Sequence, residues 1–266
     1  MSEYRYKRFT TRLLFRDLRF ATDAGRPGDT VPSFELLTTD GRQLGNSDVF
    51  GDKPVLFIFG SMTCPMTASS APGVQKLFEE FGDRVTFIML YVREAHPGEY
   101  FTQSETMEDK LQSARALQEF YAIEWTVAVD NINGDLHRAL DPKPNAAFLT
   151  SSAGQILFRS IWAADYAALH QALVDVSSCR TMNKTESTKL IGPVIRAMGE
   201  VQAVMERGGP QSVRDLWRAG FPMALAGRVA TLFRPLTPDH RGIAAVLTLG
   251  GGMIIVLGLL SVSLLI

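Results

Sequence analysis

The sequence predicts an α/β fold in which helices cover both faces of a central sheet, followed by helical segments and a C-terminal transmembrane helix. Apolar runs of strand length, beginning with residues 55–59, alternate with segments whose apolar residues recur at helical spacing. Two further apolar runs, joined through residues 152–154, are typical of a hairpin. Strands that are apolar throughout need cover on both sides of the sheet, and an uncharged stretch over residues 242–266 ends the sequence.

Composition limits the classes of function open to this chain. Its 266 residues are 46% hydrophobic, which is enough for a sizeable core, and its two cysteines are too few for a disulfide scaffold or a tetrahedral zinc site. The net charge of −1 conceals basic ends, because residues 27–179 carry 10 Lys and Arg against 20 Asp and Glu. An acidic centre argues against nucleic-acid binding, whereas basic flanks favour an anionic membrane surface.

The first two segments are an arm and a domain. Residues 1–26 form a basic N-terminal arm in which cationic and apolar side chains alternate. We interpret it as a solvated or core-packed arm, with an interfacial helix as the alternative. Residues 27–176 form the α/β domain, which opens with Gly28 and Asp29. Within it we expect strands at residues 55–59, 85–92, 126–129, 146–150 and 155–158.

Helices are expected between and after these strands. One follows Cys64, where Val74, Leu77 and Phe81 have helical spacing. A second covers residues 107–117 with Thr106 as its N-cap, and the last covers residues 166–176. This alternation of strands and helices predicts a sheet covered on both faces.

The remaining chain suggests attachment to a membrane. Residues 177–241 are expected to form a linker and amphipathic helices close to the membrane surface. Residues 242–266 are expected to form a transmembrane anchor, because a helix of this length can span about 30 Å of hydrocarbon. Arg228, Arg234 and Arg241 precede this stretch, and no charge follows it. The positive-inside rule then predicts a single-pass C-terminal anchor whose α/β domain faces the cytoplasm.

Cys64 is the residue that most strongly suggests chemistry. It lies between the strand at residues 55–59 and a predicted helix, and the positive end of a helix dipole favours a thiolate. His96 follows the next strand, so both side chains leave the same edge of the sheet if the two strands are parallel neighbours. A Cys–His pair there would supply a nucleophile and its base or proton donor, although a histidine after a strand is more often an ordinary loop residue.

Two motifs carry a family resemblance. Gly28-Asp29 followed by a buried strand and Cys64-Pro65 resembles redoxins of the thioredoxin fold. The runs 59–65 (FGSMTCP) and 91–96 (YVREAH) resemble the iodothyronine deiodinase family more specifically, with Cys64 where that family has selenocysteine. The resemblance covers about residues 27–176. It implies a thioredoxin-like fold and a single catalytic Cys64 assisted by His96, with Thr63 or Ser61 hydrogen-bonded to the site.

The resemblance also implies residues that contact substrate. Thioredoxin-fold proteins carry a cis-proline before the strand that faces the active cysteine, and Pro144 has that position. Its backbone, with Asn145 beside it, would then lie next to Cys64, where Pro65 and Glu94 complete the substrate-binding set. The family's second histidine has no counterpart here, since Gln103 and Ser104 occupy its place. Its glutamate–arginine pair falls on Asn145 and Ala146, so a general thiol-dependent reduction is expected rather than thyroid-hormone deiodination.

We therefore expect a membrane-anchored thiol oxidoreductase that acts on a peroxide, a disulfide or a halogenated carbon. It would need no metal and no bound cofactor, and an external thiol would be its electron donor. One alternative is a one-cysteine peroxiredoxin-like peroxidase, because Ser61 stands where peroxiredoxins have a threonine and Arg93 could face the thiolate. Another is a non-catalytic thioredoxin-fold module that tethers a partner at the membrane. Cys179 is either a resolving thiol or incidental.

Overall fold

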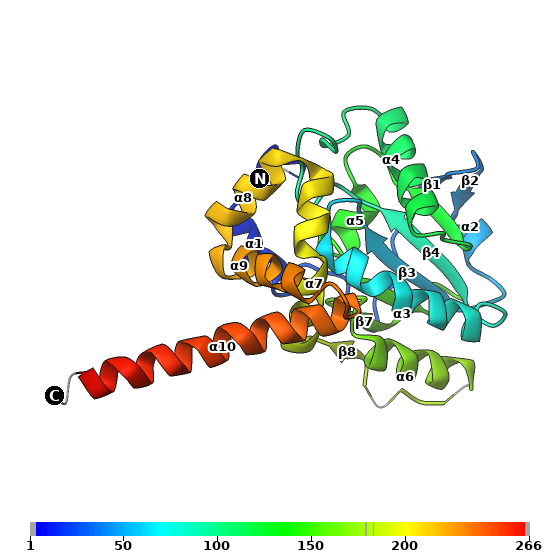
Figure 1. Cartoon of the computed structure of the whole chain (residues 1–266). Helices are drawn as coiled ribbons and strands as arrows, with labels where there is room; N and C mark the ends of the chain where they lie inside the picture. Colours follow the sequence, from blue (N-terminus) through cyan, green and yellow to red (C-terminus); the bar gives the residue numbers. More distant parts are fainter. Residues whose placement is uncertain (1–3, 179, 183, 264–266) are drawn as a thin grey trace.

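A single mixed sheet forms the centre of the molecule (Figure 1). The computed structural model describes residues 4–178, 180–182 and 184–263, with the side chains of residues 253–263 excepted. The strands of the sheet follow the order β2-β1-β5-β4-β3-β6-β7-β8. Their bounds are β1 Glu35–Thr38, β2 Gln43–Gly45, β3 Val55–Gly60, β4 Thr86–Tyr91, β5 Thr126–Val129, β6 Ala147–Thr150, β7 Ile156–Ser160 and β8 Glu186–Ser187.

Helices connect these strands and continue beyond them. Those of the first 180 residues are α1 Thr11–Asp17, α2 Asn46–Val49, α3 Pro65–Phe81, α4 Met107–Phe120, α5 Asp135–Leu140 and α6 Tyr166–Ser177. Later in the chain come α7 Ile191–Gly208, α8 Pro210–Ala219, α9 Phe221–Ala230, the 3₁₀ turn η1 Thr231–Phe233 and α10 Pro238–Ser263. Thr106 caps α4 as expected, because its hydroxyl accepts from the Asp109 N–H while the Asp109 carboxylate accepts from the Thr106 N–H.

The pairing of the strands gives a thioredoxin-like core. β3 pairs in parallel with β4, and the intervening helix is α3. β6 lies antiparallel to β3 on its other side and forms a hairpin with β7, which leads into α6. The four central strands therefore have the order β4-β3-β6-β7, with the β1–β2 pair and β5 added beyond β4. This confirms the predicted α/β fold with a mixed sheet.

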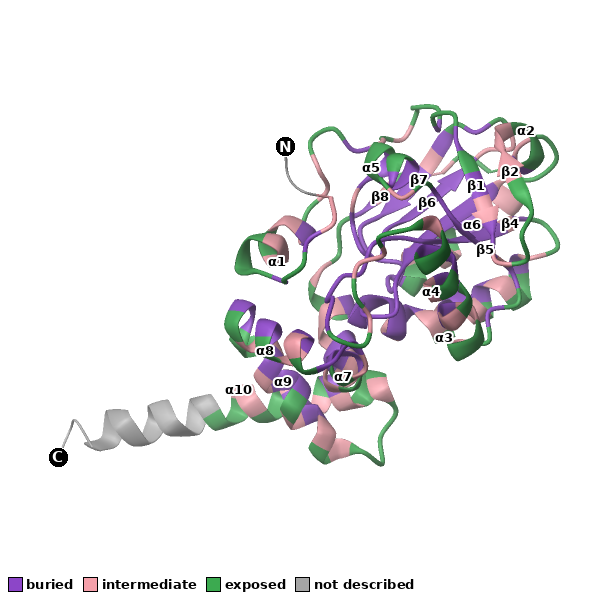
Figure 2. Ribbon diagram, turned by 90° about the horizontal axis from the view of Figure 1, so that it is seen from above, coloured by how far each residue is buried: buried purple, intermediate pink, exposed green. Residues whose placement is uncertain are grey.

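Apolar cores on both faces of the sheet hold the helices in place. α3, α4 and α6 cover one face, where Val74, Leu77 and Leu173 pack with Leu56 and Ile58 of β3. On the other face, alternate residues of β3 pack against α5 and the segment before β1. Every residue of β3 is buried, as Figure 2 shows for the centre of the sheet. The continuous apolar run is thus explained by burial on both sides.

The arm and the later helices pack together over the N-terminal end of α3. Met198 and Val201 of α7, Leu216 of α8 and Phe9 of the arm share one apolar cluster with Ala68 of α3. The arm thus packs against α3 and the later helices. The boundaries drawn between arm, domain and later helices at residues 26, 176 and 241 stay a prediction.

The start of the predicted membrane anchor has a different role from the expected one. A Cβ added at Gly242 would lie 2.1 Å from the carbonyl oxygen of Ile195, and one at Gly199 would lie 1.8 Å from that of Pro238. The backbones of α7 and α10 are therefore in direct contact, and Ala245 is fully buried there. Within the described residues, no helix combines the length and apolar character needed to cross a bilayer. On this finding, the predicted transmembrane anchor at residues 242–266 is wrong, and so is the predicted localisation as a single-pass membrane protein. Residues 264–266 lie outside the described part of the chain.

Candidate active site

Cys64 and the segment that contains His96 leave the same edge of the sheet. Gly60, the last residue of β3, pairs with Tyr91, the last residue of β4. Cys64 is the N-cap of α3, and Pro65 is its first helical residue, where the missing proline N–H costs no helical hydrogen bond. The predicted topology of this edge is therefore confirmed, and the two loops face each other.

Hydrogen bonds join the two loops through Thr63. Its backbone N–H donates to Oε2 of Glu94 at 3.0 Å, and its hydroxyl donates to the same oxygen. That hydroxyl accepts from the His96 backbone N–H at 3.0 Å, and Ser61 Oγ accepts from the Ala95 N–H at 3.3 Å. Of the residues expected at the site, Ser61, Thr63 and Glu94 thus form one network, which His96 joins through its backbone only.

Glu94 is the acid of this network. Its carboxyl group is buried and also accepts a hydrogen bond from the Tyr91 hydroxyl. Burial raises the pKa of Glu94 to about 7, although the hydrogen bonds from Thr63 and Tyr91 act in the opposite direction. Gln103 fixes the backbone here, because its amide bonds the Glu94 N–H at 3.0 Å and the Glu94 carbonyl at 2.8 Å. A carboxyl group with this pKa exchanges its proton near neutral pH.

The thiol of Cys64 is not the anion that the sequence suggested. The residue is 1% exposed and packs with Met66, Ile161 and Trp162, with Leu18 of the arm at the edge of the same cluster. Burial raises the pKa of Cys64 to about 11, despite opposing hydrogen bonds from Thr67 and the first N–H groups of α3. The helix terminus acts as predicted, but the loss of water outweighs it, so the prediction of a thiolate is wrong for this conformation.

The predicted pairing of Cys64 with His96 is also absent. No hydrogen bond joins the imidazole to the thiol in the described residues, and the buried Nδ1 of His96 has no partner. The ring packs instead on Phe9, with centroids 4.1 Å apart. Burial lowers the pKa of His96 to about 3, with the Arg93 charge acting the same way and Asp215 against it. The imidazole is consequently neutral and cannot stabilise a thiolate as a cation.

The expected substrate-binding residues after α5 are structural in this conformation. Asn145 is fully buried, and its Nδ2 donates to the Phe59 carbonyl at 3.0 Å and to Ser70 Oγ at 3.2 Å, which ties β3 to α3. Pro144 is buried before β6, and its preceding peptide bond is trans, so the predicted cis-proline is wrong. A role of either residue in substrate binding stays a prediction. Cys179 lies outside the described residues.

The cover over Cys64 includes Leu18 and Phe20 of the arm and Ala197 of α7, segments that the sequence did not connect with the site. Other contacts hold the arm in place. The Tyr6 hydroxyl donates to the Ala95 carbonyl at 2.8 Å, and the Phe9 N–H donates to Asp215 at 3.2 Å. Asp215 also accepts from the Arg8 guanidinium, which joins the arm to α8. Arg8 and Asp215 belong to no motif and lie far apart in the chain, so no spacing pattern could have indicated them.

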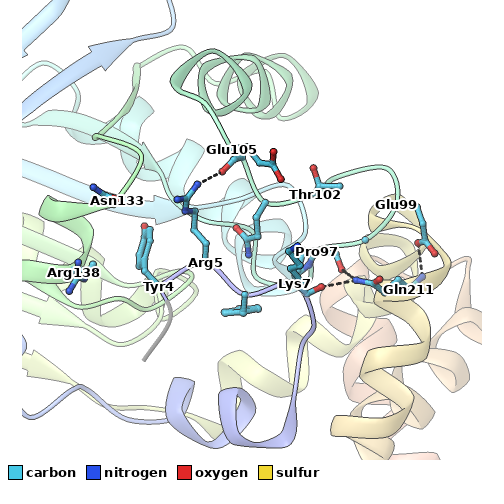
Figure 3. Close-up of a pocket in the computed structure, with 14 residues that line it drawn as sticks. Tyr4, Arg5, Lys7, Pro97, Glu99, Thr102, Glu105, Asn133, Arg138 and Gln211 are labelled. Atoms are coloured by element: carbon cyan, nitrogen blue, oxygen red, sulfur yellow. Dashed lines mark hydrogen bonds between the residues drawn. The ribbon is translucent and has the colours of Figure 1, made fainter. Parts of the chain in front are cut away.

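A cavity of about 780 Å³ opens beside this network (Figure 3). The arm supplies Tyr4, Arg5 and Lys7, the loop after β4 supplies Gln103, and α8 supplies Gln211. Because Gln103 also bonds the Glu94 backbone, the cavity lies next to the buried acid. No group of three His, Cys, Asp or Glu side chains in the described part of the chain is arranged to hold a metal ion.

Comparison with known proteins identifies the family. The iodothyronine deiodinase family model matches residues 6–160, which is more than half of the chain. The thyroxine 5-deiodinase of Ovis aries is 29% identical over 105 residues, covering 35% of each chain. The type II iodothyronine deiodinase of Fundulus heteroclitus is 30% identical over 84 residues, covering 27% of this chain and 32% of the relative. The alignments thus span about a third of these relatives.

A solved structure is similar in fold. A hypothetical protein from Sinorhizobium meliloti 1021 superposes with a TM-score of 0.51 at 13% identity, covering 64% of this chain and 93% of that one. At this identity the likeness concerns the fold alone. The family model, in contrast, includes both motif segments around Cys64 and His96. The chain belongs to the iodothyronine deiodinase family.

Proposed function

We propose that this chain is a thiol-dependent oxidoreductase whose reactive group is Cys64. The observation that carries the proposal is the position of Cys64 at the start of α3, one residue after Thr63, which is hydrogen-bonded to a carboxyl group titrating near neutral pH. Cys64 is the nucleophile and Glu94 the proton donor in this proposal, which their position at one edge of the sheet supports. Membership of the deiodinase family supports a redox role for this position.

The proposed reaction begins with loss of the Cys64 proton to solvent after the cover opens. The thiolate attacks one sulfur of a disulfide, the S–S bond breaks, and a mixed disulfide forms. The departing thiolate takes a proton, which Glu94 in its protonated form can deliver through the Thr63 hydroxyl. An external thiol then attacks the mixed disulfide, which releases Cys64 and leaves the donor oxidised.

With a peroxide, the sulfur of Cys64 would attack one oxygen, the O–O bond would break, and the departing oxygen would take a proton to leave as water or an alcohol. With a halogenated carbon, the sulfur would take the halogen as the carbon–halogen bond breaks, and the carbon would take a proton. In both cases the external thiol would then displace the hydroxide or halide from the sulfur, and a second thiol would release Cys64 and leave the donor oxidised.

The arm gates this chemistry in our proposal. In the closed conformation the thiol is buried among apolar residues that include Leu18 of the arm, so attack requires the arm to move. Release of the hydrogen bonds of Tyr6 and Phe9 would allow that movement. Thiol reactivity depends on the thiolate fraction and on access, and both rise when water enters. The resting enzyme is therefore expected to react slowly, with substrate or partner binding favouring the open form.

The test measures turnover with defined substrates. Wild-type protein is incubated with glutathione disulfide, hydrogen peroxide or an iodinated phenol, with dithiothreitol as reductant, and thiol consumption and iodide release are followed. The proposal expects turnover with at least one substrate, lost in Cys64→Ser and retained in Cys179→Ser. Equal rates in wild type and Cys64→Ser with all three would contradict it. Peroxide turnover would assign the peroxidase subtype, and iodide release the dehalogenase subtype.

A second candidate is a non-catalytic thioredoxin-fold module, which the burial of Cys64 favours. In that case the sulfur acts only as a small apolar side chain of the core. Cys64→Ala would then leave any partner binding intact. Cys64 would also stay unreactive toward hydrogen peroxide and glutathione disulfide after the arm is loosened by Arg8→Gln. Intact-protein mass spectrometry of adduct formation distinguishes this module from the enzyme.

A further inference from the structure

A second cavity, of about 640 Å³, lies between the arm, α5 and the loop that follows α5. Three guanidinium groups from different segments line it, Arg16 from α1, Arg93 from the loop after β4 and Arg138 from α5. Tyr4 and Arg138 line both this cavity and the one beside Gln103, and Figure 3 shows the two side chains next to each other. The thiol chemistry proposed above uses none of these three arginines.

Arg93 is a buried cation without an acidic partner. The residue is 4% exposed, its Nη1 donates to the Tyr6 hydroxyl at 3.0 Å, and its Nη2 donates to the Pro142 carbonyl at 2.9 Å. Its Nε is buried with no hydrogen-bond partner, and Arg93 forms no ion pair with a described carboxylate, although the charge of the buried Asp17 acts on it. Rings of Tyr6 and Tyr4 face the guanidinium at 4.8 and 5.8 Å. Such π-contacts stabilise a cation only partly, so this charge is one that a bound anion would offset.

The other two arginines line the same cavity. Arg16 has a buried Nη2 without a partner, while its Nε reaches Asp17 at 3.3 Å. Arg138, in the last turn of α5, is exposed and forms no ion pair with a described residue. Guanidinium groups offer paired N–H donors whose spacing matches the oxygens of carboxylates and phosphates.

Acidic residues and a lysine also line the cavity. Asp23 and Asp135 line it too, together with Lys143. Lys143 is paired with Asp141 at 3.2 Å, and Asp135 accepts from Asn131 at 2.7 Å. With Arg16 also paired with Asp17, the two guanidinium groups of the cavity that form no ion pair with a described residue are those of Arg93 and Arg138.

We propose that this cavity is a binding site for a small anionic molecule whose head group is a phosphate or a carboxylate. The head would lie among Arg16, Arg93 and Arg138, with a neutral body against the ring of Tyr4. The cavity exceeds what a bare phosphate would fill, so an organic anion is the expected ligand. Binding would be additional to the chemistry of Cys64, since neither Cys64 nor the neighbouring hydrogen-bonded pair of Thr63 and Glu94 lines this cavity.

Isothermal titration with the full-length wild-type protein tests this site. Inorganic phosphate and citrate are titrated separately in HEPES at low salt, so that the two head groups are compared. We expect saturable binding of at least one, weakened about tenfold when sodium chloride rises from about 50 to about 300 mM, because the attraction is between charges. No saturable binding of either anion at low salt would overturn the proposal.

Variants locate the anion without touching the buried arginine. Arg138→Gln and Arg16→Gln are each expected to weaken binding about tenfold, the size of effect that one lost charged contact typically has. Arg84→Gln, at an exposed arginine after α3, is the matched control and is expected to bind as wild type. Binding that survives both Arg138→Gln and Arg16→Gln unchanged would place the anion elsewhere and overturn the assignment. A result in which Cys64 is inert but the anion binds would refute the proposed function and leave this site standing.

Discussion

The backbone N–H and the hydroxyl of Thr63 both donate to one carboxylate oxygen of Glu94. This arrangement couples the residue next to the thiol with the acid that follows β4. Because the partner strands β3 and β4 are parallel, the two loops can meet only at this edge of the sheet. The protonation state of Glu94 therefore bears directly on the geometry of Cys64.

The burial of Glu94 predicts a pH-dependent stability. Its pKa is about 7 in the folded protein against an ordinary value of 4.5, so the folded state holds a proton that the unfolded state releases between these values. The free energy of unfolding is expected to fall as pH rises from about 5 to about 7.5, by roughly 1–3 kcal/mol from this group. Urea unfolding across this range measures it. Glu94→Gln should flatten the dependence of the free energy of unfolding on pH, whereas the control Glu124→Gln, at an exposed position, should not. If Glu94→Gln leaves the slope of this dependence unchanged, Glu94 is not the group responsible for it.

The cover over the thiol predicts that Cys64 is alkylated slowly and that its alkylation rate rises only at high pH. With a pKa of about 11, Cys64 is expected to react with iodoacetamide at pH 7.5 at least tenfold more slowly than free cysteine, and its rate should keep rising above pH 9. His96→Gln is expected to leave the midpoint of this profile in place, because the neutral imidazole makes no contact with the sulfur that would shift it. If the pH profile of the wild-type alkylation rate has a midpoint below 8, and His96→Gln moves that midpoint upward, the predicted interaction of Cys64 with His96 would be supported and the burial argument contradicted.

The contact between Arg8 and Asp215 predicts a latch on the arm. Arg8 is half exposed whereas Asp215 is buried and also accepts from the Phe9 N–H. Arg8→Gln is expected to loosen residues 6–18 and to increase the alkylation rate of Cys64 about three- to tenfold, as access limits the reaction. Arg12→Gln, at an exposed position of α1, is the matched control. Equal rates in the two variants would show that this ion pair does not hold the cover.

These contacts explain which features the sequence could predict. The strand at residues 55–59 and the shared sheet edge of Cys64 and the loop that contains His96 follow from local apolar pattern and chain direction, and both are confirmed. The cover could not be inferred, because Phe9 approaches His96 from a segment 87 positions earlier without any repeating pattern. The thiolate prediction failed for the same reason, since burial depends on those distant segments.

The membrane prediction failed for a different physical reason. The hydropathy of residues 242–266 and their lack of charge indicate that the segment is removed from water, but they do not tell whether it contacts lipid or protein. Gly242 and Gly199 allow α10 and α7 to approach at backbone distance, so part of the apolar stretch is buried against protein. The same pattern of small and apolar residues is compatible with packing against another helix and with contact to lipid. The position of α7 decides between these two interpretations.

A buried ion pair behind the site predicts a large stability effect. Lys110 Nζ contacts the Asp130 carboxylate and donates to the Asn131 carbonyl at 2.9 Å, and both charged residues are about 97% buried. Lys110→Met is expected to reduce the free energy of unfolding by about 3–5 kcal/mol, because Asp130 is left charged and unpaired. The double variant Lys110→Met with Asp130→Asn should recover part of this loss. Urea unfolding of the three proteins measures the coupling, and additive losses would contradict it.

The close approach of the loop after β4 to α7 gives a last prediction. A Cβ at Gly98 would lie 2.2 Å from the Gly208 carbonyl oxygen and 2.4 Å from Ser212 Oγ, which itself donates to the His96 carbonyl. Gly98→Ala must therefore displace backbone at the junction of α7 and α8, and we expect a loss of about 1–3 kcal/mol together with faster alkylation of Cys64. Gly192→Ala is the control, since its Cβ would meet only the Arg196 side chain at 3.7 Å within a helix, where alanine is favoured. If Gly98→Ala matches this control in urea midpoint and in alkylation rate, the junction does not hold the cover in place.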